Sequence, residues 1–411
     1  MLKKLNEYLA LPLLGLIRLY QWTLSPDKGL PSLWLKWKVC LHHPHCSQYS
    51  IDVLKRYGFV PGVAYALDRV ISCNPMSVRK YPTFDGQKAY DPPFYRVVFF
   101  SWSPLGEPFL KQLFDDPRFE IVWVVSMPPK PVWRGQKVRP NTVAQYAKKL
   151  WISNIQTPSK LWLKASEGVQ FYSWLKKLDP DFLVVVAYGK IIPKHILDAA
   201  KIAPINVHWS LLPKYRWASP LQQVFLDQET KTGITVMKMN EKMDEWEILD
   251  KLEVAIPFDW TVEDLINWIK QYWPKFLADT LRNYAKWEIK SVVQNNTEAT
   301  YTSKISKEDG QIDPWTLPLN KIYAKYRAYK IWPWIWFLLD GDFVHKDLLV
   351  KVEKLEVDQN EFEKYKDLPL IVDKIQGKLN PAISLLRVKP AGRSSMDFED
   401  FKRWYRFLQV T

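Results

Sequence analysis

An asparagine, a histidine and an aspartate near the middle of the chain have side chains that together could transfer an acyl group to an amine. Asn206 and His208 are two residues apart in a strand-like run, and side chains two apart on a strand point to the same face. Asp244 follows a second strand-like run, 235–240. The Asn206 amide could donate to an oxyanion, while His208 and Asp244 could move protons. From spacing alone a histidine at a strand end is more often structural. The catalytic role of these three residues is therefore a hypothesis that depends on a fold that brings them together.

A regular alternation of strand and helix patterns between residues 95 and 208 supplies such a fold. Short apolar runs predict buried strands at 95–100, 119–125, 182–187 and 204–208. The segments between them predict helices at 107–114, 142–150, 168–178 and 193–200. This order predicts an α/β fold with a doubly wound, mostly parallel sheet, in which ligands bind beyond the carboxyl ends of the strands. His208 stands at such an end.

The 411 residues are enough for three domains, which we place at 1–92, 93–299 and 300–411. The first is predicted to be helical, with helices near 8–20, 51–57 and 61–72, and a Pro- and Tyr-rich linker at 74–93. The third is predicted to be β-rich, with strands at 335–339, 347–357 and 382–388 and helices at 319–329 and 397–405.

The motif Asn206-x-His208-x-Ser210-Leu211-Leu212-Pro213, followed by Asp244, resembles the signature of the folate-dependent formyltransferases. Residues 95–411 more specifically resemble the methionyl-tRNA formyltransferases. The supporting matches recur in order along the chain at Phe99-Phe100, Ser103-Pro104, 130–137, 185–189, Asp313 and Trp332-Pro333. The resemblance implies a Rossmann-like catalytic domain and a small, OB-like C-terminal β-barrel that helps to hold tRNA.

The same resemblance implies roles for individual residues. Asn206, His208 and Asp244 would be catalytic, and the turn formed by Ser210, Leu211, Leu212 and Pro213 would border the folate. The formyl donor would be 10-formyltetrahydrofolate, the acceptor would be the amino group of initiator methionyl-tRNA, and no metal is expected.

Basic residues cluster in one loop of the α/β domain, at Lys130, Arg134, Lys137 and Arg139. Such a run is usually a solvated surface, but the family resemblance favours contact with tRNA phosphates, which position RNA without reading its sequence. The whole chain has 58 lysines and arginines against 44 aspartates and glutamates, a net charge of +14. This excess favours a polyanionic partner, either nucleic acid or an anionic membrane surface.

The first unit is similar to the membrane-protein-insertion efficiency factors. The similarity rests on short motifs spread over 14–92: Tyr20-Gln21, Ser25-Pro26, Pro44-x-Cys46-Ser47-Gln48-Tyr49, Gly58, Gly62, Arg69, Cys73-Asn74-Pro75 and Tyr90-Asp91-Pro92. That family implies a peripheral inner-membrane helper. Residues 1–92 carry a charge of +6 and open with an apolar helix that is too broken to span a bilayer. We therefore expect a cytoplasmic protein, a monomer by default, whose residues 1–92 bind an anionic inner-membrane surface.

The three cysteines of the chain, Cys40, Cys46 and Cys73, all lie in this first unit beside three histidines, His42, His43 and His45. Such a cluster could bind a metal ion such as zinc, although its spacing fits no zinc pattern well. Three cysteines packed in a small core are the favoured interpretation.

Three alternatives to this function remain open from the sequence. The protein could formylate a sugar amine or a purine precursor, although the long third domain and the basic loop argue against this. It could be an inactive formyltransferase-like protein that acts in membrane-protein assembly. The two parts could also be neighbouring proteins joined in one gene model.

Tryptophan and glycine occur in unusual numbers, 21 and 14. Ordinary usage of about 7% would give roughly 29 glycines. We predict that twelve tryptophans stand where the natural protein has glycine, through a UGA codon read as glycine. Several lie in site loops or follow predicted helical runs, such as Trp273 after 262–272 and Trp287 after 275–286. The twelve are Trp37, Trp102, Trp123, Trp133, Trp151, Trp209, Trp217, Trp246, Trp273, Trp287, Trp334 and Trp404. Two alternatives are a Trp-rich lineage with adapted loops and a decayed enzyme with a blocked folate site.

Overall fold

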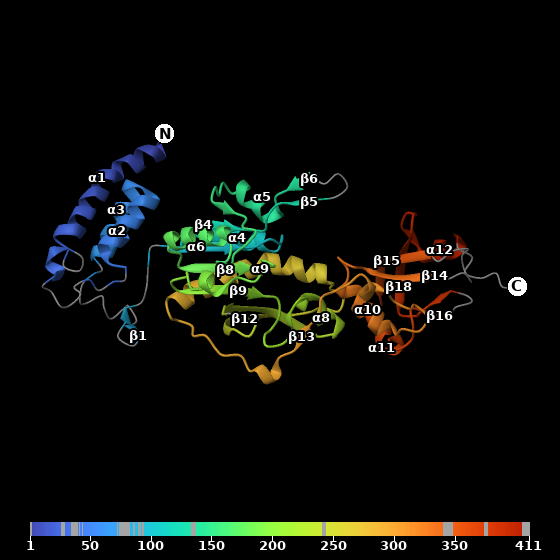
Figure 1. Ribbon diagram of the computed structural model, residues 1–411. Helices are drawn as coiled ribbons and strands as arrows, with labels where there is room; N and C mark the ends of the chain where they lie inside the picture. Colours follow the sequence, from blue (N-terminus) through green and yellow to red (C-terminus); the bar gives the residue numbers. More distant parts are fainter. Residues whose placement is uncertain are drawn as a thin grey trace. The chain divides into compact units, whose positions relative to one another are not determined.

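A computed structural model of the chain describes residues 2–25, 29–33, 40, 42, 44–71, 73, 83–84, 87–88, 92, 94–132, 137–240, 244–339, 348–373 and 377–404 (Figure 1). The chain divides into two compact units. One comprises Met1–Ile205 with Lys275–Ser291, and the other comprises Asn206–Pro274 with Val292–Thr411.

Three helices form the N-terminal part of the first unit: α1 (Leu2–Thr23), α2 (Cys46–Tyr57) and α3 (Phe59–Ile71), with a 3-10 turn at Leu30–Leu33. Helix α1 continues through Pro12, so it is longer than the sequence predicted. Helices α2 and α3 are separated only by Gly58, whose φ of 77° is the left-handed conformation that glycine adopts without strain. Most of the predicted linker lies outside the described residues, which include two short strands there, β1 (Thr83–Phe84) and β2 (Gln87–Lys88).

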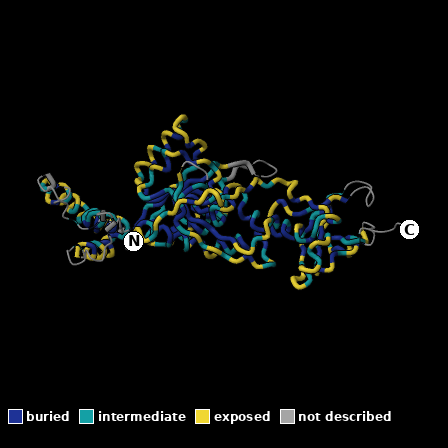
Figure 2. Tube along the Cα trace, turned by 90° about the horizontal axis from the view of Figure 1, so that it is seen from below, coloured by how far each residue is buried: buried dark blue, intermediate teal, exposed yellow. Residues whose placement is uncertain are grey.

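A parallel sheet forms the rest of the first unit. Its strands are β3 (Tyr95–Phe100), β4 (Phe119–Val125), β7 (Ile155–Gln156) and β8 (Phe182–Val186). The helices between them are α4 (Gly106–Asp115), α5 (Thr142–Lys149), α6 (Ser166–Leu178) and α7 (Lys194–Leu197). Every residue of β8 is buried, and so is every residue of β3 except Arg96, which explains their continuous apolar sequences (Figure 2). The predicted strands and helices of this region are confirmed, with α7 shorter than expected.

The complete sheet has seven strands in the order β12-β11-β9-β8-β3-β4-β7. Strand β9 is Ala203–His208, and β11 (Lys231–Lys238) pairs with β12 (Glu247–Ala255) in antiparallel register. The sheet is therefore mixed, and β12 was not predicted. The other elements of this region are β10 (Arg216–Trp217), α8 (Pro220–Leu226), α9 (Val262–Ala285), a 3-10 turn at Asn296–Glu298 and β13 (Tyr301–Thr302).

Helix α9 corrects one sequence prediction. We expected a helix to end at residue 272, with Trp273 as its terminal residue, and a second helix to begin after it. A single helix instead runs through Pro274. Leu265, Ile269, Leu277 and Leu281, which are spaced by multiples of four residues, are all fully buried. This continuous apolar face offsets the roughly 3 kcal/mol that an interior proline costs.

The C-terminal part of the second unit is β-rich, as predicted. An antiparallel sheet has the order β14-β15-β18-β19, formed by Ile335–Leu339, Leu348–Val357, Ile383–Pro390 and Met396–Asp397. A smaller pair is formed by β16 (Ile371–Asp373) and β17 (Lys378–Leu379). The helices are α10 (Leu319–Ala328), α11 (Gln359–Tyr365) and α12 (Phe398–Trp404), and a 3-10 turn spans Glu308–Gly310.

Candidate active site

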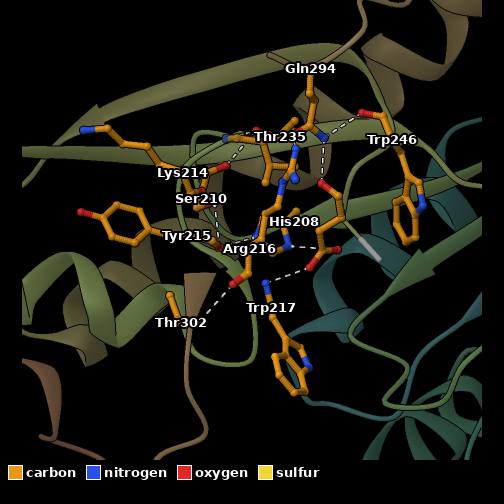
Figure 3. A network of polar contacts seen from close by, with 12 residues as sticks. His208, Ser210, Lys214, Tyr215, Arg216, Trp217, Thr235, Trp246, Gln294 and Thr302 are labelled. Atoms are coloured by element: carbon orange, nitrogen blue, oxygen red, sulfur yellow. Dashed lines mark hydrogen bonds and ion pairs between the residues drawn. The ribbon is translucent and has the colours of Figure 1, made fainter. Parts of the chain in front are cut away.

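Strand β9 ends at His208, and the structure brings Asp244 beside it. His208 is 6% exposed, and its Nδ1 lies 3.7 Å from Oδ1 of Asp244 (Figure 3). This separation is that of an ion pair and is longer than a hydrogen bond. Asn206 is half-buried and lies two residues earlier on the same strand, so its side chain leaves the same face of the sheet. Two of the three predicted residues are thus in contact, and the third is on the adjacent same-face position of β9.

A backbone carbonyl determines the orientation of the histidine ring. Nε2 of His208 lies 2.9 Å from the backbone oxygen of Tyr215. A carbonyl oxygen can only accept, so Nε2 carries a proton and donates it. The other nitrogen, Nδ1, is left facing the Asp244 carboxylate. The ring therefore lies between a backbone acceptor and a carboxylate, an arrangement that suits a residue that moves protons.

The turn predicted to border folate is held by strand β11. The Thr235 hydroxyl donates to the backbone oxygen of Ser210 at 2.8 Å, and it accepts the N–H of Leu212 at 3.1 Å. The Ser210 hydroxyl donates to the backbone oxygen of Lys214 at 2.6 Å. Leu212 is fully buried with Met237, Trp246 and Ile248. The turn is fixed before any ligand binds, and the ring of Trp246 fills the space beneath it.

Asp244 adopts an unusual backbone conformation, with φ of 54°. Three contacts hold it there. The backbone N–H of Trp217 donates to Oδ2 of Asp244 at 2.9 Å, and the Gln294 amide donates to the backbone oxygens of Asp244 at 2.8 Å and Trp246 at 2.7 Å. The carboxylate is therefore aimed at His208 by loops that are far apart in the sequence.

Arg216 connects these contacts and was not predicted from the sequence. Its side chain is 1% exposed. It donates to Oε1 of Gln294 at 2.9 Å, to Oδ1 of Asn296 at 2.7 Å and to the Tyr301 hydroxyl at 3.2 Å, and it lies 3.7 Å from Oε1 of Glu245. Figure 3 shows Arg216 and Gln294 beside His208. A guanidinium remains charged in proteins, so it can be buried only where several acceptors surround it.

Segment 294–302 supplies many of the partners of loop 213–219. Tyr215 N–H donates to the Thr300 hydroxyl at 2.8 Å, and β10 pairs in parallel with β13. Burial raises the pKa of the Tyr215 hydroxyl, and its hydrogen bond to Glu229 raises it further, so Tyr215 stays neutral and anchors the loop. Arg216 is a charged residue three positions after the recognised motif, so the sequence could have indicated that it belongs to the site. Gln294 is 50 residues from Asp244. Nothing in the sequence around Gln294 indicated a role at the site.

The predicted basic loop is a β-hairpin. Its strands, β5 (Lys130–Val132) and β6 (Lys137–Arg139), pair so that Lys130 lies opposite Arg139 and Val132 opposite Lys137. Arg134 and Trp133 lie outside the described residues. Three of the four predicted tRNA-binding residues therefore lie on one two-stranded ribbon.

The fold and site define an enzyme of the formyltransferase class. The Formyl transferase family model matches residues 96–281, and the model of the Formyl transferase C-terminal domain matches residues 304–406. A third model, that of the YidD membrane protein insertion efficiency factor, matches residues 9–84.

Curated relatives define the family more narrowly. The methionyl-tRNA formyltransferase of Caldicellulosiruptor saccharolyticus is 40% identical over 64% of this chain and 83% of its own length. Those of Hydrogenobaculum sp. and Bacillus velezensis are 36% and 32% identical, over 70% and 75% of this chain and 94% of each relative. The chain belongs to the methionyl-tRNA formyltransferase family. A solved sugar 3N-formyl transferase aligns with a TM-score of 0.46 and 16% identity over 66% of this chain and 88% of its own.

Proposed function

We propose that this protein transfers the formyl group of 10-formyltetrahydrofolate to the amino group of initiator methionyl-tRNA. The observation that carries the proposal is the contact of His208 with Asp244 at the carboxyl end of β9, within the motif that resembles the formyltransferase signature. Methionyl-tRNA is the substrate that the names of the curated relatives print, and those relatives are matched over most of their length.

The reaction joins the methionyl nitrogen to the formyl carbon and breaks the bond between that carbon and N10 of the folate. The amine attacks the formyl carbon, and the carbonyl oxygen becomes an oxyanion. The Asn206 amide donates to this oxyanion. The attacking nitrogen loses a proton and N10 gains one as it leaves. His208, which lies beside Asp244, carries the proton between them.

The turn Ser210–Pro213 would form a wall of the folate site. Its backbone is fixed by Thr235, so binding does not have to order it. The folate is a substrate and not a resident group, and no metal is required by these steps.

Transfer RNA would bind through the hairpin that carries Lys130, Lys137 and Arg139, through Arg134, and through the domain proposed at 300–411. Phosphate contacts release counterions, so tRNA affinity should fall steeply as salt rises. Replacing Lys130 and Arg139 by glutamine should flatten that slope, whereas replacing Lys354 and Lys364, which lie on the C-terminal strand β15 and on α11, tests whether that domain contributes.

Residues 1–92, proposed as a separate domain before 93–299, would bind the cytoplasmic face of the inner membrane and assist membrane-protein insertion. In helix α1 the side chains of Leu9, Leu11, Leu16, Leu19 and Trp22 are all more than half exposed. Exposed apolar side chains on a positively charged unit suit a surface of anionic lipid. None of the described helices is both long and apolar enough to cross a bilayer.

The test of the proposed reaction is product formation. The full chain is incubated with 10-formyltetrahydrofolate and either methionyl-tRNA or an amino-sugar nucleotide, and each product is identified by mass spectrometry. We expect N-formylmethionine after hydrolysis of the tRNA, with the sugar unchanged. Formylation of the sugar alone would contradict the proposal.

We also propose that many tryptophans of this sequence are glycines in the natural protein, through UGA read as glycine. Nine non-glycine residues have a positive φ in the described part of the chain, and four of them are tryptophans: Trp151, Trp217, Trp287 and Trp334, with φ between 60° and 78°. The left-handed region costs a residue with a side chain about 1–2 kcal/mol and costs glycine nothing.

Two of these tryptophans close helices in the way that glycine usually does. After α5, Trp151 N–H donates to Lys148 and Ile152 N–H donates to Ala147. After α9, Trp287 N–H donates to Tyr284 and Glu288 N–H donates to Asn283. Both pairs of bonds are Schellman motifs, whose left-handed position is most often glycine.

Buried tryptophans add a second argument. The indole N–H groups of Trp246 and Trp273 are buried without a hydrogen-bond partner among the described residues. A buried indole N–H normally finds a partner, and leaving it unmade costs about 1–3 kcal/mol. The geometry gives no such support at Trp123, which is buried in β4 against Phe171, or at Trp404, which is exposed. Trp37 and Trp133 lie outside the described residues.

Peptide mass spectrometry of the protein from its own cells tests the recoding. Peptides that span positions 151, 217, 246 and 287 should have the mass of glycine there, and peptides with tryptophan at those positions would refute it. Trp174, in the interior of α6, was not among the recoded positions and should be read as tryptophan.

A further inference from the structure

Three cysteine sulfurs converge in the N-terminal helical part of the chain. Cys40 precedes α2, Cys46 is the first residue of α2, and Cys73 follows the end of α3. Their sulfur atoms all lie within 4.8 Å of one another. The residues are up to 33 positions apart in sequence, so tertiary folding and not local geometry brings the sulfurs together.

The spacing of the sulfurs is that of a tetrahedral metal site. The Cys40 sulfur lies 3.5 Å from that of Cys46 and 3.9 Å from that of Cys73. Zinc binds thiolates at about 2.3 Å, which places two sulfurs of a tetrahedron about 3.8 Å apart. The two distances lie on either side of that value, so an ion could enter with small side-chain movements.

Other groups at the cluster suit bound thiolates. The backbone N–H of Cys46 donates to the Cys40 sulfur at 3.3 Å, a contact of the kind that supports metal ligands. Cys46 also opens a twelve-residue helix, whose N-terminus favours negative charge. His45 precedes it and lines the same cavity, but its ring nitrogens are not among the atoms that lie within 4.8 Å of one another, so its side chain must turn to reach the three sulfurs.

The surroundings argue against cysteines that only fill a core, which is the interpretation the sequence favoured. Cys40 and Cys73 are half-buried, and the three cysteines line a cavity of about 550 Å³ that also has His45, three serines and apolar side chains of α1 and α3 in its wall. A small helical unit has little apolar surface to bury, and such units often depend on a metal or a disulfide.

We propose that Cys40, Cys46 and Cys73 bind a zinc ion as thiolates, with His45 as the fourth ligand. The ion joins the segment before α2 to the residues after α3, and binding displaces the three thiol protons. The site is independent of formyl transfer, because none of these residues belongs to the candidate active site.

The test measures zinc in the untagged, full-length protein. After purification with reductant, one zinc per chain is titrated in, weakly held metal is removed by gel filtration, and the rest is quantified by mass spectrometry. We expect about one zinc per chain, as for a structural Cys₃His site. Cys46→Ser and Cys73→Ser should each reduce zinc content at least tenfold, and His45→Gln should weaken zinc affinity at least tenfold. The control is Ser47→Ala, which alters the same cavity without removing a ligand.

A second measurement uses the unaltered protein, so that it remains informative if the variants fail to fold. In the unaltered protein, alkylation of the three thiols should slow at least tenfold when zinc is added and recover with a chelator. Cobalt in place of zinc should give thiolate-to-metal charge-transfer absorption. Zinc lost on gel filtration, alkylation unaffected by zinc, or a Cys40–Cys46 disulfide formed under the same reducing conditions would each overturn the proposal.

Discussion

The candidate active site and the cysteine cluster are both groups of reactive side chains, but the chain holds them in different ways. At the first, the backbone oxygen of Tyr215 accepts from His208, the Gln294 amide donates to the backbone of Asp244, and Thr235 holds the neighbouring turn at Ser210. At the second, the sulfurs line the wall of a cavity and mainly contact one another. The first arrangement is complete without a bound group, whereas the second gains its strongest contacts only when an ion is present.

This difference indicates which changes each region will tolerate. Catalysis depends on groups held in place before the substrate arrives, so the removal of one supporting contact should slow the reaction without unfolding the domain. A metal site supplies folding free energy, so the removal of a ligand should act on stability first.

The largest expected effect is on turnover. We expect His208→Ala to lower kcat at least about 1000-fold, because general acid–base catalysis contributes roughly 10² to 10⁴ and the contact with Asp244 is lost as well. Affinity for methionyl-tRNA should survive. The control is His195→Ala, since His195 lies on α7 and contacts the Leu161 carbonyl. Near-normal turnover of the His208→Ala enzyme would contradict the assignment of His208 as the acid–base residue.

Arg216 provides the next largest effect, through positioning and not through contact with substrate. Arg216→Lys keeps the charge but cannot reach Gln294, Asn296 and Tyr301 together. We expect kcat to fall on the order of 10- to 100-fold, as for lost supporting contacts, with KM for methionyl-tRNA unchanged. Arg387→Lys, at an exposed pair with Asp397, is the matched control. A rise in KM alone would show that Arg216 serves binding instead.

Membrane association should be more tolerant of single changes, because apolar contacts add gradually. Leu9 and Leu16 lie on one face of α1, seven residues apart, and both are exposed. Replacing both with asparagine should weaken binding to liposomes of anionic lipid roughly tenfold or more, given about 0.8 kcal/mol per buried methylene. Formyl transfer should be unchanged. The control variant is Leu338→Asn, on β14. Equal liposome binding by the unaltered protein and the Leu9/Leu16 double variant would exclude α1 as the membrane contact.

The sequence predicted these regions unequally, for physical reasons. Strands β3 and β8 are continuous apolar runs buried on both faces, so their bounds were predicted within a residue. Strand β12 alternates half-buried and exposed residues toward its end, and the charged side chains among them interrupt the apolar pattern by which a strand is recognised. His208 and Asp244 were recognisable because a motif surrounds them. Gln294 was not, because its role depends on which loops meet in the fold. The cysteine cluster was found by residue type, but its distances required the structure.

The smallest expected effect concerns the positions that we propose to be recoded. Trp151 is 93% exposed and has φ of 60°, so Trp151→Gly should remove strain and little packing. We expect the free energy of unfolding to rise by about 1 kcal/mol. Trp174→Gly, inside α6, should lower it by about the same amount, because glycine disfavours a helix interior. Thermal denaturation compares the two variants, and equal losses would contradict the left-handed argument.

The most direct test of the active-site account is a double-mutant cycle for formyl transfer with His208→Gln, Asp244→Asn and the variant that carries both. The two side chains are 3.7 Å apart and are assigned one shared task. The rate of N-formylmethionine formation, with both substrates saturating, should therefore fall about as far in the double variant as in the more damaged single variant, because residues that act as a unit are not additive. Losses that multiply would mean that His208 and Asp244 act separately, and that their contact does not carry the reaction.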